Sequence, residues 1–157
     1  MVFRHARKSD AEVILGIYNA VRGKGFCIWN DEYPFMPEIE ADLQSEGLFV
    51  LEADNEIIGA ASIVPQNEMD SVSVWTHRDA AEIARIVIAP EFQGRGYSEI
   101  IVSHLLSELK NRNVKYVHLA VERNQIPAQK TYKKLGFTTV GKWESYGHHY
   151  FLCEKEL

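Results

Sequence analysis

Residues 85–109 read RIVIAPEFQGRGYSEIIVSHLLSEL and carry the strongest structural signal of the chain. The apolar run that stops at Pro90 is typical of a buried strand. Apolar residues then recur every four positions, which predicts a helix: Tyr97, Ile101, Leu105 and Leu109. Gly94 and Gly96 lie between the two elements, and residues without a Cβ atom allow positive φ angles and close approach of a ligand. A strand, a glycine turn and a helix N-terminus form an anion site, to which Arg95 adds a positive charge.

The glycine turn alone leaves two interpretations open, a flexible connection or a cradle for phosphates. It is not a Walker A loop, because no Gly-Lys-Ser/Thr sequence follows the glycines. It is not a dinucleotide fingerprint either, because Glu99 occupies the position of the third glycine.

Length and composition indicate an ordinary globular protein. The 157 residues predict a single domain spanning 1–157, and 46% hydrophobic with 25% charged residues is typical of such a domain. The net charge of -5 argues against nucleic acid or an anionic membrane as the main partner. No run approaches the ~18 apolar residues of a membrane span, and the N-terminus has no secretory signal.

The two cysteines, Cys27 and Cys153, form neither a CxxC pair nor a zinc pattern. They therefore predict reduced thiols, a cytoplasmic location and no metal site.

The remaining sequence alternates between strand and helix patterns. Strands are expected at 2–6, 48–54, 56–64, 82–90, 114–122, 138–145 and 148–157, and helices at 8–22, 37–47, from 97 onward and at 126–137. Ser9 and Glu12 match a capping box at the start of the first helix, and residues 64–82 are expected to be a connection. The order predicts an α/β (mixed α+β) fold in which helices cover a mixed sheet.

Two segments together resemble the GNAT family of N-acetyltransferases. Residues 93–98, QGRGYS, resemble its acetyl-CoA-binding loop, Q/R-x-x-G-x-G/A, with Ser98 departing from the usual Gly or Ala. Residues 121–137 resemble N-x-x-A-x-x-x-Y-x-x-x-G-F, with Gln125 in place of the asparagine. Four residues of this second motif match in register: Ala128, Tyr132, Gly136 and Phe137. The resemblance covers residues 82–140 and implies a central mixed sheet of six to seven strands flanked by about four helices.

The resemblance also implies acetyl-CoA as the acyl donor and assigns residues to it. The strand backbone at Ile86, Val87 and Ile88 would pair with the pantetheine arm, and the amide of Gln125 would add a hydrogen bond. The diphosphate would lie in the loop of Gln93, Gly94, Arg95, Gly96, Tyr97 and Ser98. Tyr132 would lie near the thioester sulfur, where a phenol can protonate the departing thiolate.

Other site residues stay open between a functional and a structural role. Glu122 and Glu82 are candidates for the general base, with His118 as a third. In the acceptor site, Trp29 and Tyr33 would form an aromatic wall, and Asp31 and Glu32 would attract a cationic amine. The same aromatics could equally pack into the core.

The expected function is N-acetyl transfer from acetyl-CoA to a primary amine of a small molecule or peptide. Direct transfer in a ternary complex is expected because neither cysteine lies in a family motif. The alternatives are a non-catalytic module of the same fold that binds or senses acyl-CoA, and an unrelated nucleotide-binding protein. The sequence leaves a homodimer open.

Overall fold

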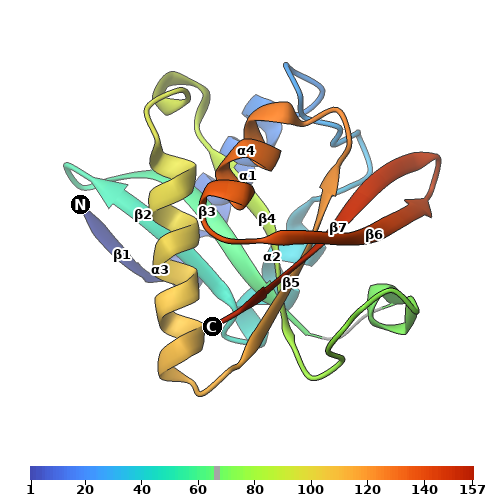
Figure 1. Ribbon diagram of the computed structural model, residues 1–157. Coiled ribbons are helices and arrows are strands. Elements are labelled where there is room, and N and C mark those ends of the chain that lie inside the picture. Colours follow the sequence, from blue (N-terminus) through green and yellow to red (C-terminus); the bar gives the residue numbers. More distant parts are fainter. Residues whose placement is uncertain (66–67) are drawn as a thin grey trace.

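A seven-stranded mixed sheet organises the computed structural model, which describes residues 1–65 and 68–157 (Figure 1). The strand order is β1-β2-β3-β4-β5-β7-β6. The strands are β1 Val2–His5, β2 Leu48–Ala53, β3 Glu56–Val64, β4 Ala81–Ile88, β5 Tyr116–Glu122, β6 Thr138–Ser145 and β7 His148–Glu156. The helices of the described residues are α1 Ala11–Val21, α2 Met36–Gln44, α3 Tyr97–Asn111 and α4 Ile126–Lys134, with short 3₁₀ turns at Lys8–Asp10, Glu68–Ser71 and Pro90–Phe92.

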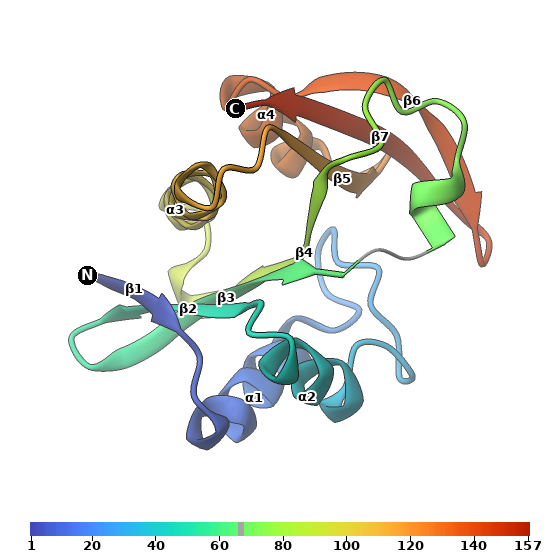
Figure 2. The same ribbon diagram turned by 90° about the horizontal axis from the view of Figure 1, so that it is seen from below.

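Strands β4 and β5 form a parallel pair that soon separates. Their register within the described residues has two positions, Ala81 opposite Val117 and Glu82 opposite His118. Beyond this point β4 continues along β3, while β5 pairs along its whole length with β7. Figure 2 shows the resulting two half-sheets, β1–β4 and β5–β7–β6, diverging from their junction. The sheet therefore opens between β4 and β5.

Helices cover both faces of the sheet (Figures 1 and 2). Helices α1 and α2 pack on one face of β1–β4, and their core includes Ile14, Tyr18 and Ile39, each fully buried. Helix α3 packs on the opposite face through buried Ile101 and Leu105. Helix α4 lies next to α3, and a hydrogen-bonded ion pair of 3.0 Å joins Lys134 to Glu99. The first half of the sheet is thus covered on both faces, and the core around α3 extends to β5 and β7 of the second half.

The expected elements agree closely with the structure, and the hairpin predictions are confirmed. Strands β2 and β3 are joined by Asp54 and Asn55, both at positive φ, as a tight two-residue turn requires. The expected connection at 64–82 contains the turn Glu68–Ser71, while its residues 66–67 lie outside the described residues. No helix in the described part of the chain is long and apolar enough to cross a membrane.

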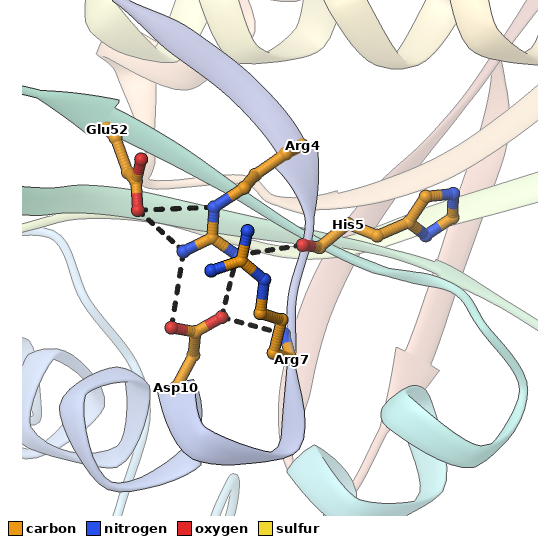
Figure 3. A network of polar contacts seen from close by, with 5 residues as sticks. All are labelled: Arg4, His5, Arg7, Asp10 and Glu52. Atoms are coloured by element: carbon orange, nitrogen blue, oxygen red, sulfur yellow. Dashed lines mark hydrogen bonds and ion pairs between the residues drawn. The ribbon is translucent and has the colours of Figure 1, made fainter. Parts of the chain in front are cut away.

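The predicted capping box of Ser9 and Glu12 is wrong. Helix α1 begins at Ala11, and no described side chain caps its N-terminus. The carboxylate of Asp10 instead accepts hydrogen bonds from the backbone N–H of Arg7 at 2.7 Å and from the guanidinium of Arg4 at 2.8 Å (Figure 3). Arg4 also bonds Glu52 at 2.6 Å, so one arginine joins β1, β2 and the turn before α1. With Asp10 engaged in these hydrogen bonds, residues 8–10 form a 3₁₀ turn where the sequence predicted the first turn of the helix.

Candidate functional site

The loop between β4 and α3 has the geometry of an anion cradle. Gly94 and Gly96 have φ of +75° and +83°, a conformation that favours glycine. A Cβ atom placed on either glycine would meet no atom of the described residues within 4 Å, so both face open space. Gly96 precedes α3, and no described side chain caps that helix. The first N–H groups of α3 and its dipole are therefore available to a negatively charged ligand.

Side chains of the loop fix its shape. The amide of Gln93 donates a 3.0 Å hydrogen bond to the carbonyl of Ile88 at the end of β4. The guanidinium of Arg95 lies 5.6 Å from the ring centroid of Phe92, which in turn packs edge-on against Tyr97. The residues Gln93 to Gly96 are exposed, so the charge of Arg95 stays accessible to a ligand.

The opening between β4 and β5 leads to this loop. The last three residues of β4, after its separation from β5, are Ile86, Val87 and Ile88. Their apolar side chains pack into the hydrophobic cores on the two faces of the sheet. A bulge opposite Ala60–Ser62 of β3 interrupts the ladder at Arg85, whose φ of +50° is left-handed. The backbone of β4 therefore presents an edge to the opening while its side chains remain in the core.

Tyr132 lies on the α4 side of the second half-sheet. Its ring packs edge-on against Phe137 at 5.9 Å, and it lines a pocket of about 390 Å³ with Val121 of β5 and Cys153 of β7. Burial raises the pKa of the Tyr132 phenol above its ordinary value, and the Cys153 thiol adds to the effect. The phenol is therefore held in its protonated form, which is the form that donates a proton.

The candidate bases lie at opposite ends of the opening between β4 and β5. Glu82 of β4 pairs with His118 where the strands are still joined. Glu122 ends β5 and is 6% exposed; one of its carboxylate oxygens accepts a 2.7 Å hydrogen bond from the backbone N–H of Asn124. His118 is buried against Trp75 at 3.7 Å and bonds Glu154 at 2.7 Å, so it belongs to the core.

The segment between α1 and α2, residues 22–35, is called here the α1–α2 segment. Its two predicted acceptor residues lie in different surroundings: Trp29 packs edge-on against buried Tyr18 at 5.0 Å, whereas Tyr33 is 44% exposed. Asp31 and Glu32 are exposed as well. The amide of Gln125 bonds the carbonyl of Phe26 at 3.1 Å, which ties the segment to the start of α4.

Sequence reasoning missed a buried ion pair beside this segment. Arg85 donates to both carboxylate oxygens of Asp42, at 2.9 and 2.7 Å, and its third nitrogen donates to the Tyr33 hydroxyl at 2.7 Å. Ser62 completes the shell of Asp42 with a 2.7 Å hydrogen bond. A charged residue inside the apolar run IARIVIAP is the signal that could have drawn attention to Arg85, since buried charges need partners.

The sequence matches the family model "Acetyltransferase (GNAT) family" over residues 14–137, most of the chain. The chain belongs to the GNAT family of acetyltransferases. This confirms the family resemblance and, with the strand and helix arrangement, the predicted fold.

Curated relatives match only in part. A mycothiol acetyltransferase of Tsukamurella paurometabola is 37% identical over 67 residues, which cover 43% of this chain and 23% of the relative. A [ribosomal protein bS18]-alanine N-acetyltransferase of Salmonella typhimurium is 36% identical over 59 residues, which cover 38% of this chain and 40% of the relative. The chain thus spans less than half the length of these relatives.

Solved GNAT structures share the whole fold. A ribosomal-protein-alanine N-acetyltransferase from Brucella melitensis superposes with a TM-score of 0.80 at 20% identity and covers 100% of both chains. An acetyltransferase from Salmonella typhimurium, solved with its cofactor acetyl-CoA, superposes with a TM-score of 0.77 at 22% identity. The match covers 99% of this chain and 93% of the Salmonella chain. At such identities the likeness concerns the fold alone.

Proposed function

We propose that this protein transfers an acetyl group from acetyl-CoA to a primary amine of a small molecule or peptide. The observation that carries the proposal is the open glycine loop at the N-terminus of α3, reached directly from the opening between β4 and β5. The donor set fits a diphosphate, because backbone N–H groups, a helix dipole and Arg95 all favour negative charge. Family membership supports the same donor.

Each residue of the loop and of β4 has a defined part in this proposal. Gly94, Arg95, Gly96, Tyr97 and Ser98 hold the diphosphate, and Gln93 keeps the loop against β4 through its bond to Ile88. The backbone at Ile86–Ile88 binds the pantetheine arm and polarises the thioester carbonyl. Gln125 contributes from the start of α4 once its bond to Phe26 is exchanged. When bound, acetyl-CoA supplies the acetyl group as an activated thioester.

Proton handling falls to two groups on opposite faces of the sheet. Glu122 or Glu82 accepts a proton from the acceptor amine, whose nitrogen then forms a bond to the acetyl carbonyl carbon. Tyr132 gives its phenolic proton to the sulfur as the carbon–sulfur bond breaks. Transfer is direct, without an acetylated cysteine, because Cys153 is buried with a raised thiol pKa and Cys27 lies outside both family motifs.

The decisive experiment is a calorimetric titration with acetyl-CoA, with ATP as the control ligand. Saturable binding of acetyl-CoA without binding of ATP is expected. Release of the CoA thiol is then measured with a panel of primary amines, and at least one amine is expected to accelerate it.

Each arm of the experiment can contradict the proposal. Absence of acetyl-CoA binding, or equal binding of ATP, would rule out the donor site. Binding without amine-dependent thiol release would favour the alternative of an acyl-CoA-sensing module. Glu122→Gln and Glu82→Gln, tested separately, identify the base as the one whose loss removes the acidic limb of the pH–rate profile, the fall of the rate at low pH.

A further inference from the structure

Arg85 holds an unusual position at the separation of β4 and β5. It has left-handed backbone, which a residue with a side chain adopts only where its surroundings enforce it. This conformation coincides with the bulge in β4 and with the two-point bond to Asp42, whose carboxylate is 2% exposed. Together with Ser62, this shell fixes Arg85 rigidly, so that its remaining nitrogen points at the Tyr33 hydroxyl.

The α1–α2 segment is therefore held from both sides of the opening. On the β4 side, Tyr33 bonds Arg85; on the β5 side, the carbonyl of Phe26 accepts from Gln125. Within the segment, Arg22 donates to the carbonyls of Asn30 and Pro34, each at 2.6 Å. These bonds give the segment one conformation across the mouth of the opening.

Three side chains from distant parts of the sequence, Tyr33, Glu122 and Tyr150, lie beside the opening. Tyr150 of β7 lies directly opposite Glu122 of β5, on the same face of the sheet. The pKa of Tyr150 is raised by burial and then by the neighbouring Tyr33 and Glu122, as expected for three groups close together. Two phenols and a carboxylate are thus grouped beside the opening, Tyr150 and Glu122 by their strand register and Tyr33 by its bond to Arg85.

The charges around these three side chains favour a cation. Glu122 is nearly buried, and one of its oxygens has no partner within residues 1–65 and 68–157. Neither arginine that contacts the α1–α2 segment has a guanidinium free to bind a carboxylate of the acceptor at two points. The guanidinium of Arg85 already binds Asp42, and that of Arg22 donates to two backbone carbonyls. The exposed ring of Phe26, at 58%, adds apolar surface at the rim.

We propose that Tyr33, Tyr150 and Glu122 bind the acceptor as a cationic amine on an aromatic or aliphatic body without a carboxylate next to the amine, and that Arg85 is the positioning residue that holds Tyr33 there. This inference rests on the proposed acetyl transfer and assigns the acceptor class of the same site. The ring faces attract the ammonium group and Glu122 pairs with it.

Tyramine and tyrosine are the matched probes, since they differ by one carboxylate. Each is titrated by calorimetry into the protein saturated with CoA, which reports binding without turnover. Tyramine is expected to bind at least about tenfold more tightly, because the carboxylate of tyrosine would lie near the carboxylate of Glu122 and be repelled by it. Comparable binding of tyrosine, or no binding of tyramine at about 10 mM, above the usual range of KM values, would overturn the acceptor class.

Two variants test the role of Arg85. Tyr33→Phe removes only the hydroxyl that Arg85 holds and is expected to raise the KM for tyramine about fivefold, with the KM for acetyl-CoA unchanged. Arg85→Met is expected to act more strongly in the same direction, and Arg85→Lys to restore part of the loss. Tyr116→Phe, at the opposite end of β5, is the matched control and leaves both KM values unchanged.

The outcomes separate this inference from the proposed function. If Tyr33→Phe behaves like Tyr116→Phe, the positioning role of Arg85 is wrong, even where Arg85→Met fails to fold. Acetyl transfer to other amines would then still stand. Loss of acetyl-CoA binding in the unchanged protein would instead contradict the proposed function itself.

Discussion

Tyr132 is the residue whose chemistry is most directly testable. Tyr132→Phe keeps the ring against Phe137 and removes the proton donor, so kcat is expected to fall about 10²-fold or more while the affinity for acetyl-CoA changes little. Because burial raises the pKa of the phenol above 10.0, its protonated form persists to higher pH than that of an ordinary tyrosine. In the unchanged protein, titration of this group should therefore cause no loss of rate below about pH 10.

A pH profile of kcat for both proteins provides the check. Equal kcat values would show that the leaving sulfur takes its proton from another source. The assignment of Tyr132 as the acid would then be abandoned, while the donor site would remain.

Asp42 is the residue on which we expect the stability of the site to depend. Asp42→Ala leaves Arg85 charged and largely buried without its carboxylate, and we expect a loss of about 3 kcal/mol or more in the free energy of unfolding. Urea unfolding measures this loss. The control is Glu108→Ala, which breaks the more exposed pair with Arg112 and should cost about 0.5 kcal/mol or less. Equal costs would mean that the Arg85 pair contributes little.

At the residue scale, the sequence predicts residues that lie in local motifs and misses those that act through distant partners. Gly96 and Tyr132 are recognisable because their neighbours in the chain complete a pattern. Arg85 and Asp42 lie 43 positions apart, and the residues around either one do not indicate that the other is its partner. Their pairing depends on how α2 packs against β4, which periodicity alone does not determine.

The junction of β4 and α3 offers a matched pair of glycines for a test at the element scale. Gly96 and Gly147 have φ of +83° and +79°, and a Cβ atom on either would meet no described atom. Alanine at either position should therefore cost a similar amount of stability, about 1 kcal/mol. Gly96→Ala alone should also weaken acetyl-CoA binding, by about tenfold, since its methyl group enters the cradle. Calorimetric titration measures the affinity of both variants for acetyl-CoA. Equal affinities would contradict the proposal that the glycine loop holds the diphosphate.

The Arg4 network joins β1, β2 and the turn before α1, and its strength should depend on pH (Figure 3). Hydrogen bonds from Arg4 lower the pKa of Asp10 below its ordinary 3.8. A lowered pKa stabilises the fold above pH 3.8, and this contribution is lost as the pH falls through the folded-state pKa. Arg4→Met should cost about 2 kcal/mol at pH 7, and its deficit should shrink below pH 3.8.

Urea unfolding of both proteins between pH 7 and pH 2 tests the dependence. Lys134→Met, which breaks an exposed pair, is the control and should show a small deficit. A deficit for Arg4→Met that stays constant down to pH 2 would show that packing of the arginine stem, and not its charge, is what stabilises the fold.

At the element scale, the sequence predicts the type and order of strands and helices, while tertiary contacts set their ends. The helix expected from residue 8 begins at Ala11, because the carboxylate of Asp10 accepts hydrogen bonds from Arg4. The opening between β4 and β5 is invisible to periodicity, because a strand shows the same apolar pattern whether or not a neighbouring strand pairs with it. Only the resemblance to a known family implied that the backbone of residues 86–88 would pair with a ligand there.

At the scale of the whole molecule, the opening leaves the two half-sheets with few backbone contacts to each other, although one hydrophobic core around α3 includes side chains of both. Two register positions join β4 to β5, and the ion pair of Lys134 and Glu99 joins α4 to α3. Helices α1 and α2 cover only the first half (Figure 2). A ligand lying between β4 and β5 would therefore add contacts to both halves at the place where the protein has fewest.

Acetyl-CoA should accordingly stabilise the folded state as a whole. At a concentration of about 100 times Kd, binding adds about 2.7 kcal/mol to the free energy of unfolding. For a chain of this size that corresponds to a rise in Tm of about 5–10 °C. Differential scanning calorimetry measures the shift, with ATP at the same concentration as the control ligand. Gly147→Ala should retain the full shift and Gly96→Ala should lose most of it at equal ligand concentration, because the glycine loop supplies the affinity. An undiminished shift in Gly96→Ala would place the stabilising contacts elsewhere than in the loop between β4 and α3.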